Sequence, residues 1–187
     1  MNLSRRKLGL AASVMSVATM AAAMVAGGST VAQASSASAG HVKPFAGVFN
    51  PIQNVGNHLC LQPVNPVPNS PVVQEPCDGT PIQGWEYMHD PLGGFVFVNQ
   101  ASGDCLNAFI KAENGAPIGI DTCRSVSNER WDPTLPLPNV VSLISRIGGS
   151  DTGFCLDVPG ASSTPGVQMQ LWGCNGTLAQ RWVVGFA

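Results

Sequence analysis

Apolar residues occur in short runs along this chain, and the runs are separated by glycine, proline and asparagine. Residues 95–98 and 140–144 are runs of β-branched and aromatic side chains, the residue types that favour β-strands. Turn-forming pairs stand between other runs, at Asn114-Gly115 and at Pro165-Gly166. No stretch after residue 40 has the apolar spacing that predicts an amphipathic helix. The pattern therefore predicts an all-β protein with short strands.

A motif of two cysteines and a tryptophan recurs three times after residue 45. Each copy opens on a cysteine, a leucine and a polar residue: Cys60-Leu61-Gln62, Cys105-Leu106-Asn107 and Cys155-Leu156-Asp157. Each copy closes on a tryptophan: Gln83-Gly84-Trp85, Glu129-Arg130-Trp131 and Gln180-Arg181-Trp182. From first cysteine to tryptophan the copies span 25, 26 and 27 residues, and from cysteine to cysteine 17, 18 and 19. This regular spacing indicates a threefold repeat of about 45 residues, with copies at about 45–88, 93–134 and 139–187.

The repeat selects one disulfide pairing for the six cysteines. Six cysteines allow fifteen pairings, but one pairing treats all copies alike within a copy: Cys60–Cys77, Cys105–Cys123 and Cys155–Cys174. In the chain-entropy model, loops of this size contribute on the order of 3 kcal/mol each to the free energy of unfolding. One disulfide per repeat is therefore expected.

A single copy is too small to bury a hydrophobic face, so the three copies are expected to pack together. Four short strands per copy predict about twelve strands, and closing them into a barrel would remove exposed sheet edges. Trp85, Trp131 and Trp182 hold equivalent positions, and we expect them to form the shared core. The proline-rich residues 133–138 are expected to separate the second copy from the third.

Residues 1–39 have the pattern of a secretory signal peptide. The basic Arg5-Arg6-Lys7 precedes an apolar run over residues 8–28, and small residues then predict cleavage after Ala34 or Ala39. The run is long enough for a membrane anchor, but Ala, Gly, Ser and Thr dominate it, and cleavage signals follow at once. Residues 4–10 also resemble a twin-arginine export signal. We therefore expect a secreted, extracellular protein in which residues 40–187 form one domain without membrane insertion.

Charge and cysteine usage exclude several classes of function. The chain has nine basic and eleven acidic residues, and removal of residues 1–39 takes away three basic ones, so six minus eleven leaves a net charge of about −5. This balance argues against binding to nucleic acid or to an anionic membrane. Cysteines in an exported protein predict disulfides rather than metal ligands. His41, His58 and His89 have no metal-ligand spacing and no catalytic motif is present, so we expect no metal, no cofactor and no enzymatic activity.

The repeats resemble the ricin-type β-trefoil lectin domain, in the form found in secreted bacterial proteins of the actinobacterial type. Cys-Leu-Asp at 155–157 and Gln-x-Trp at 180–182 carry the resemblance, which covers about residues 45–186. The third copy matches most closely and the first most loosely. The resemblance implies a β-trefoil with a six-stranded barrel, three capping hairpins and up to one shallow sugar site in each copy.

The resemblance also implies a set of sugar-binding residues in the third copy. Asp157 would accept hydrogen bonds from sugar hydroxyls, and Trp172 would stack on the apolar face of the ring. Gln170 would add a polar contact, and Gln180 would orient Asp157. The family has asparagine where this chain has Ala179. We expect Asn175 to reach the same rim of the sugar.

Each of these roles has a structural alternative. Glu75 and Asp121 occupy the positions equivalent to Trp172, so the fold does not need an aromatic residue there, which favours binding. Gln62 and Asn107 occupy the positions equivalent to Asp157, so a polar residue there can also be a turn residue of the fold. The first two copies lack the pattern and are predicted to be structural.

Two functions follow from these observations. The first is a non-catalytic lectin that binds a glycan or polysaccharide, galactose-like or xylan-like, through the third copy. The alternative is a degenerate trefoil that binds a protein partner, as a targeting subunit of a secreted complex or as an inhibitor.

Overall fold

The computed structural model describes residues 47–109, 111–137 and 139–185. The predicted signal peptide, its cleavage sites and His41 lie outside the described residues. Twelve strands form from the described residues, four in each repeat. The first repeat contains β1 (Asn50–Asn54), β2 (Cys60–Pro63), β3 (Val72–Glu75) and β4 (Gly84–His89). The second contains β5 (Phe95–Asn99), β6 (Cys105–Ala108), β7 (Ile118–Asp121) and β8 (Trp131–Leu137). The third contains β9 (Val140–Ser145), β10 (Phe154–Asp157), β11 (Gln170–Gly173) and β12 (Trp182–Val184).

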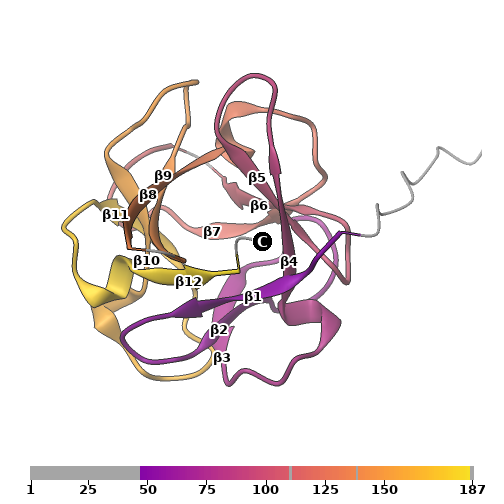
Figure 1. The fold of residues 1–187 in the computed structure, drawn as a ribbon, viewed down its shortest axis with the longest axis vertical. Helices are drawn as coiled ribbons and strands as arrows, with labels where there is room; N and C mark the ends of the chain where they lie inside the picture. The colour runs from indigo at the N-terminus through magenta and orange to yellow at the C-terminus, as the bar shows by residue number, and fades with distance from the viewer. Residues whose placement is uncertain (1–46, 110, 138, 186–187) are drawn as a thin grey trace, which may run out of the picture. The chain divides into compact units, whose positions relative to one another are not determined.

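The first and last strands of the three repeats close into a barrel. Strand β1 pairs with β4 and β12, β5 pairs with β4 and β8, and β9 pairs with β8 and β12, all antiparallel. Every one of these six strands therefore has a neighbour on both sides, which removes exposed edges. The three repeats surround the centre of the barrel in Figure 1.

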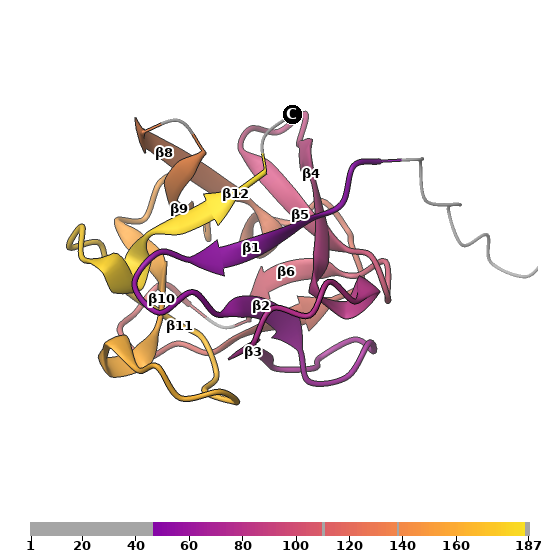
Figure 2. The same ribbon diagram turned by 60° about the horizontal axis from the view of Figure 1, so that its bottom comes forward.

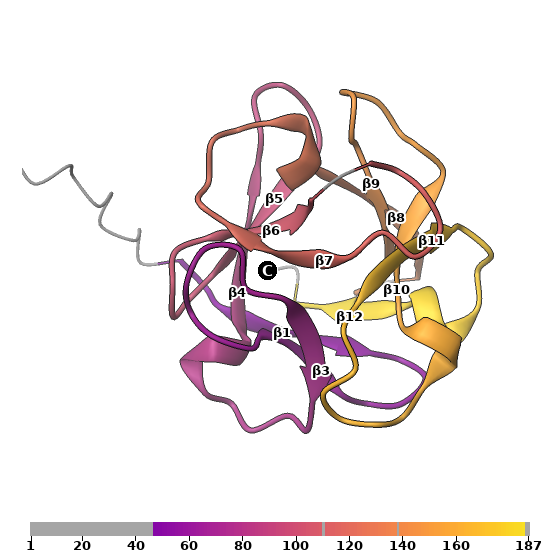
Figure 3. The same ribbon diagram turned by 180° about the vertical axis from the view of Figure 1, so that it is seen from behind.

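The second and third strands of each repeat form a hairpin at one end of the barrel. The hairpins β2–β3, β6–β7 and β10–β11 lie below the barrel strands in Figure 2. Isolated bridges join the hairpins to one another, such as Pro71 with Gly119 and Pro117 with Gln170, and Figure 3 views the cap from that end. A barrel of six strands with three capping hairpins is a β-trefoil, so the predicted fold class is confirmed.

The three closing tryptophans form the core, as predicted. Trp85, Trp131 and Trp182 have at most 2% of their surface exposed. Each indole Nε1 donates a hydrogen bond to the carbonyl oxygen of the leucine after the first cysteine of its own repeat, at 3.0, 3.1 and 3.1 Å. The three predicted disulfides are present, each joining the start of a hairpin to the residues just after it. Core and hairpin are thus tied together in the same way in every repeat.

The proline-rich segment is not the separator that the sequence suggested. Strand β8 includes most of it, and Pro133 pairs with Leu143 of β9. The ladder is irregular, with a register shift between Thr134 and Leu137. A proline lacks the N–H that a regular ladder needs. Pro133 pairs just before the irregularity, and Pro136 falls within it.

Short 3₁₀ turns precede the last strand of each repeat: η1 (Pro81–Gln83), η2 (Ser127–Glu129) and η4 (Leu178–Gln180). A further turn, η3 (Pro159–Ala161), follows β10 in the third repeat. None of the helices in the described part of the chain is long and apolar enough to cross a membrane.

Candidate functional site

The third hairpin brings two of the predicted site residues opposite one another. Asp157 at the end of β10 pairs with Gln170 at the start of β11, and Cys155 pairs with Trp172. Alternate residues of a strand face the same side, so Gln170 and Trp172 share a face while Leu171 between them is buried in the core. Asp157 is 5% exposed and Trp172 is 41% exposed. A fixed carboxylate and an accessible aromatic ring therefore lie on adjacent strands.

Both oxygens of Asp157 accept hydrogen bonds from glutamine side chains. Gln170 Nε2 donates to Oδ1 at 2.8 Å, and Gln180 Nε2 donates to Oδ2 at 3.1 Å. Gln180 is fully buried in η4, where its Nε2 also donates to the Gly173 carbonyl and its Oε1 accepts from the Asn175 backbone N–H. Gln180 thus contacts Asp157 from the core side, and the orienting role expected of it stays a prediction.

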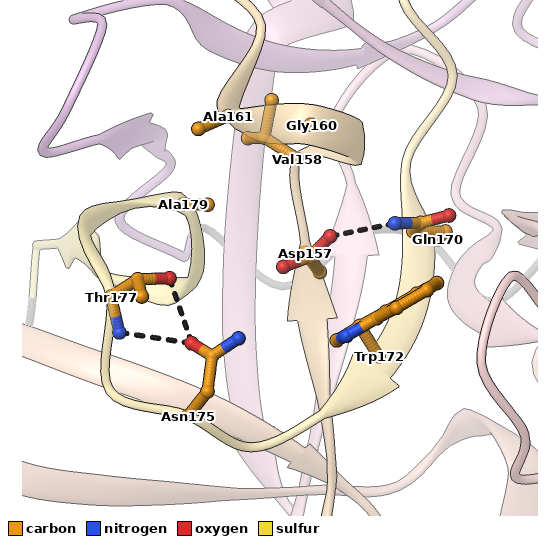
Figure 4. Close-up of a pocket in the computed structure, with 9 residues that line it drawn as sticks. All are labelled: Asp157, Val158, Gly160, Ala161, Gln170, Trp172, Asn175, Thr177 and Ala179. Atoms are coloured by element: carbon orange, nitrogen blue, oxygen red, sulfur yellow. Dashed lines mark hydrogen bonds between the residues drawn. The ribbon is translucent and has the colours of Figure 1, made fainter.

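A cavity of about 360 Å³ opens in front of Asp157. Its lining residues, drawn in Figure 4, are Asp157, Val158, Gly160, Ala161, Gln170, Trp172, Asn175, Thr177 and Ala179. Four of the five predicted site residues therefore line one cavity. The fifth, Gln180, does not line it but donates a hydrogen bond to Asp157. Trp172 lies on one side, and the small side chains of Ala161 and Ala179 lie on the side away from it in Figure 4.

Asn175 lines the cavity, but half of its side chain is already engaged. Its Oδ1 accepts hydrogen bonds from the backbone N–H of Thr177 at 3.0 Å and from the Thr177 hydroxyl at 2.7 Å. Asp78 makes the same two bonds to Thr80 in the first repeat, so this contact is a turn that belongs to the fold. The Nδ2 atom of Asn175 is the part left to act as a donor.

The electrostatics of the cavity are set by Asp157. Burial raises the pKa of its carboxyl above the ordinary value of 3.8, and the hydrogen bonds from Gln170 and Gln180 act in the opposite direction. Among the described residues that line the cavity, none carries a positive charge. The carboxylate of Asp157 has neutral hydrogen-bond partners, so the cavity suits a neutral ligand with hydroxyl groups better than an anionic ligand.

Sequence reasoning missed the wall formed by Val158, Gly160 and Ala161. Gly160 and Ala161 belong to η3 and both have positive φ, at 60° and 51°, and Val158 is the residue before this turn. It lies in the loop over residues 158–169, which is longer than the corresponding loops 64–71 and 109–117. The one signal in the sequence was the wider cysteine spacing of the third copy.

The equivalent positions of the other repeats are engaged within the protein. In the first repeat, Gln83 Nε2 donates to Gln62 Oε1 at 2.8 Å. In the second, Asn128 Nδ2 donates to Asn107 Oδ1 at 3.0 Å, and Asp121 pairs with Arg124 at 3.0 Å. The exposed aromatic residue therefore distinguishes the third hairpin. No group of His, Cys, Asp or Glu able to hold a metal ion occurs among residues that the structure describes.

The barrel, the three caps and the repeated disulfides define the protein as a β-trefoil. The sequence model of the ricin-type beta-trefoil lectin domain matches residues 48–136, which confirms the resemblance to that family predicted from the repeats. The match covers the first two repeats. The third repeat, which carries the cavity, lies beyond the matched residues.

Solved structures share this fold at low sequence identity. The designed threefold-symmetric protein ThreeFoil is 21% identical, with 72% of this chain and 95% of that one covered and a TM-score of 0.66. A Macrolepiota procera ricin B-like lectin in complex with lactose is 19% identical, with 75% and 96% covered and a TM-score of 0.62. An exo-beta-1,3-galactanase from Clostridium thermocellum is 23% identical, with a TM-score of 0.66 over 74% of this chain and 30% of that one. At these identities the likeness concerns the fold.

Proposed function

We propose that this protein is a secreted, non-catalytic lectin that binds a glycan through its third repeat. The observation that carries the proposal is that Trp172, 41% exposed, and the hydrogen-bonded carboxylate of Asp157 line one cavity from the two strands of one hairpin. A pyranose has one apolar C–H face and a rim of hydroxyls. Its receptor therefore needs a flat apolar surface beside a fixed acceptor.

The other cavity residues fit the same ligand. Gln170 and Asn175 bring amide groups to the rim, and Gln180 keeps Asp157 in place so that little ordering is needed on binding. The lactose complex of the Macrolepiota lectin and the galactanase activity of the Clostridium protein support a galactose-like ligand. A xylan-like ligand is the alternative that the same cavity accommodates.

Titration calorimetry of the full chain with galactose, lactose, xylose and xylobiose tests this proposal. We expect binding by at least one of these sugars and a loss of about tenfold in affinity for Trp172→Ala, since stacked aromatic contacts contribute about 0.5–1.5 kcal/mol beyond the burial of their area. Glu75→Ala is the matched control, because Glu75 holds the equivalent position in the first repeat, opposite Cys60. Equal binding by Trp172→Ala and by the unchanged protein would exclude this site.

A protein-binding role is the second candidate, and the closed hydrogen bonds in the first two repeats favour it. Gln62 and Asn107 are satisfied by side chains of their own repeats, which leaves two hairpins without a sugar acceptor. Purification of the protein from its natural source, followed by a search for co-purifying proteins, distinguishes the two candidate functions. A stoichiometric protein partner with no glycan binding would support the second one.

Export rests on the pattern of residues 1–39. N-terminal sequencing of protein recovered from the culture medium should begin at Ser35 or Gly40. Recovery of protein that begins at Met1 would contradict the signal peptide.

A further inference from the structure

A second cavity adjoins the candidate site, and the two share part of their walls. It measures about 170 Å³ and is lined by Asn54, Gly56, Asn57, Ala161, Leu178 and Ala179. Ala161 and Ala179 line both cavities. Gly56 and Asn57 belong to the turn between β1 and β2, so the second cavity joins the third repeat to the first.

The residues shared by the two cavities have small side chains. In the second repeat the residue equivalent to Ala179 is Asn128, and its amide extends to Asn107 at 3.0 Å. In the third repeat a methyl group stands at that position, and the other shared residue, Ala161, belongs to the turn η3. Two methyl groups therefore separate the candidate site from the second cavity.

The second cavity suits another neutral sugar residue. None of its six lining residues is charged, and Leu178, 53% exposed, offers an aliphatic surface. Asn57 donates from Nδ2 to the Gln74 side chain and to the Ser162 carbonyl, both at 2.8 Å. Among the described residues, its Oδ1 accepts one hydrogen bond, from the Leu59 N–H at 3.0 Å, which leaves a lone pair for a hydroxyl.

The same hydrogen bonds hold the second cavity in shape. Asn57 ties the β1–β2 turn to Ser162 next to η3, and Gln74 Nε2 donates to the carbonyls of Ser162 and Thr164 at 2.9 and 2.8 Å. The two walls come from different repeats but are bonded to each other. A preorganised surface costs little to order when a ligand binds.

Because the two cavities adjoin at Ala161 and Ala179, we propose that the site binds a neutral sugar chain rather than a single terminal sugar. One sugar unit of the chain stacks on Trp172. The next sugar unit lies beyond Ala161 and Ala179, over Leu178 and Asn57. A chain of acidic sugars is disfavoured, because it would place carboxylates beside Asp157. This inference rests on the proposed lectin function and names its ligand class.

Titration calorimetry of the full chain with two length series tests the proposal. The series are galactose, β-1,3-galactobiose and β-1,3-galactotriose, and xylose, xylobiose and xylotriose. In the series that binds, we expect the disaccharide to bind about tenfold more tightly than the monosaccharide, which corresponds to about 1.4 kcal/mol. Leu178→Ala should remove most of this gain and leave monosaccharide affinity unchanged.

Leu92→Ala is the matched control, since Leu92 is an exposed leucine on the β4–β5 turn, at 66% exposure. Ala179→Asn should reduce the gain in affinity from the second sugar, because the longer side chain would stand between the two cavities. The second subsite is overturned if a monosaccharide binds in a Trp172-dependent way while the disaccharide binds no better, or if the gain survives Leu178→Ala. Absence of any Trp172-dependent binding would overturn the lectin function itself.

Discussion

Gln180 donates a hydrogen bond from Nε2 to Oδ2 of Asp157 across 3.1 Å, and both side chains are buried. Gln180 belongs to the Gln-x-Trp motif that closes the repeat, whereas Asp157 faces the cavity. The contact therefore joins a residue of the fold to a residue of the candidate site. Replacement of Gln180 should affect stability and binding together.

Gln180→Glu should lower stability at neutral pH by on the order of 2 kcal/mol, because it removes the donor and sets two buried carboxylates against each other. The carboxylate can still accept from the Asn175 N–H, so the contact to Asp157 is tested separately from the turn. Urea denaturation measures the change. Adding Asp157→Asn should recover much of the loss, as in the second repeat, where Asn107 and Glu129 hold these positions. No recovery in the double variant would show that carboxylate repulsion is not the cause.

Glu129→Gln should raise the stability of the protein by about 1 kcal/mol. Glu129 is fully buried; its Oε2 accepts from the Arg124 N–H at 2.9 Å, while Oε1 has no partner among the described residues. Gln83 in the same position of the first repeat donates to Gln62 and to the Pro76 carbonyl. A glutamine at 129 would supply the donor that the carboxylate lacks.

The midpoint of urea denaturation measures this gain. Gln83→Glu is the reverse change in the first repeat and should lower the midpoint. If Glu129→Gln also lowers it, the unpartnered oxygen does not cost stability.

Trp172 and Trp182 should respond differently to the same change. Trp182→Phe leaves a gap in the core and removes the donor to the Leu156 carbonyl, 3.1 Å away, so we expect a loss of about 2 kcal/mol. Trp172→Phe alters a side chain that is 41% exposed and should change stability by less than about 0.5 kcal/mol. Denaturation of both variants provides the comparison. Equal losses would mean that Trp172 supports the fold.

The sequence predicted the parts of this protein that repeat. Cys60, Trp85 and their equivalents recur at nearly constant spacing because each repeat solves the same packing problem, so the barrel, the core and the disulfides could be predicted. Asp157 and Gln170 are expected in one site because of the family resemblance, and the structure pairs them across the third hairpin.

The parts that do not repeat could not be predicted in the same way. The η3 wall depends on positive φ at Gly160 and Ala161, and alanine gives no sequence signal for that conformation. Asn175 lines the cavity, but nothing in the sequence indicated that its Oδ1 accepts the turn hydrogen bonds from Thr177. Strand β8 was not predicted because prolines are unfavourable in a regular strand. Its pairing with β9 accommodates them through an irregular ladder.

Sugar binding should depend on pH through Asp157, in a direction opposite to stability. Burial raises the pKa of Asp157 above 3.8 in the folded protein, so folding disfavours the ionised carboxyl. Below the pKa that Asp157 has in the unfolded chain, both states are protonated and the penalty is absent. As the pH rises from that pKa to the higher pKa of the folded state, the penalty grows and the free energy of unfolding falls. Binding needs the ionised acceptor, so affinity should rise through the same folded pKa. Calorimetry and urea denaturation between about pH 3 and pH 7 measure both quantities. Asp157→Asn should abolish the pH dependence of affinity and remove the contribution of this carboxyl to the pH dependence of stability. A pH-dependent affinity that persists in that variant would assign the titration to another group.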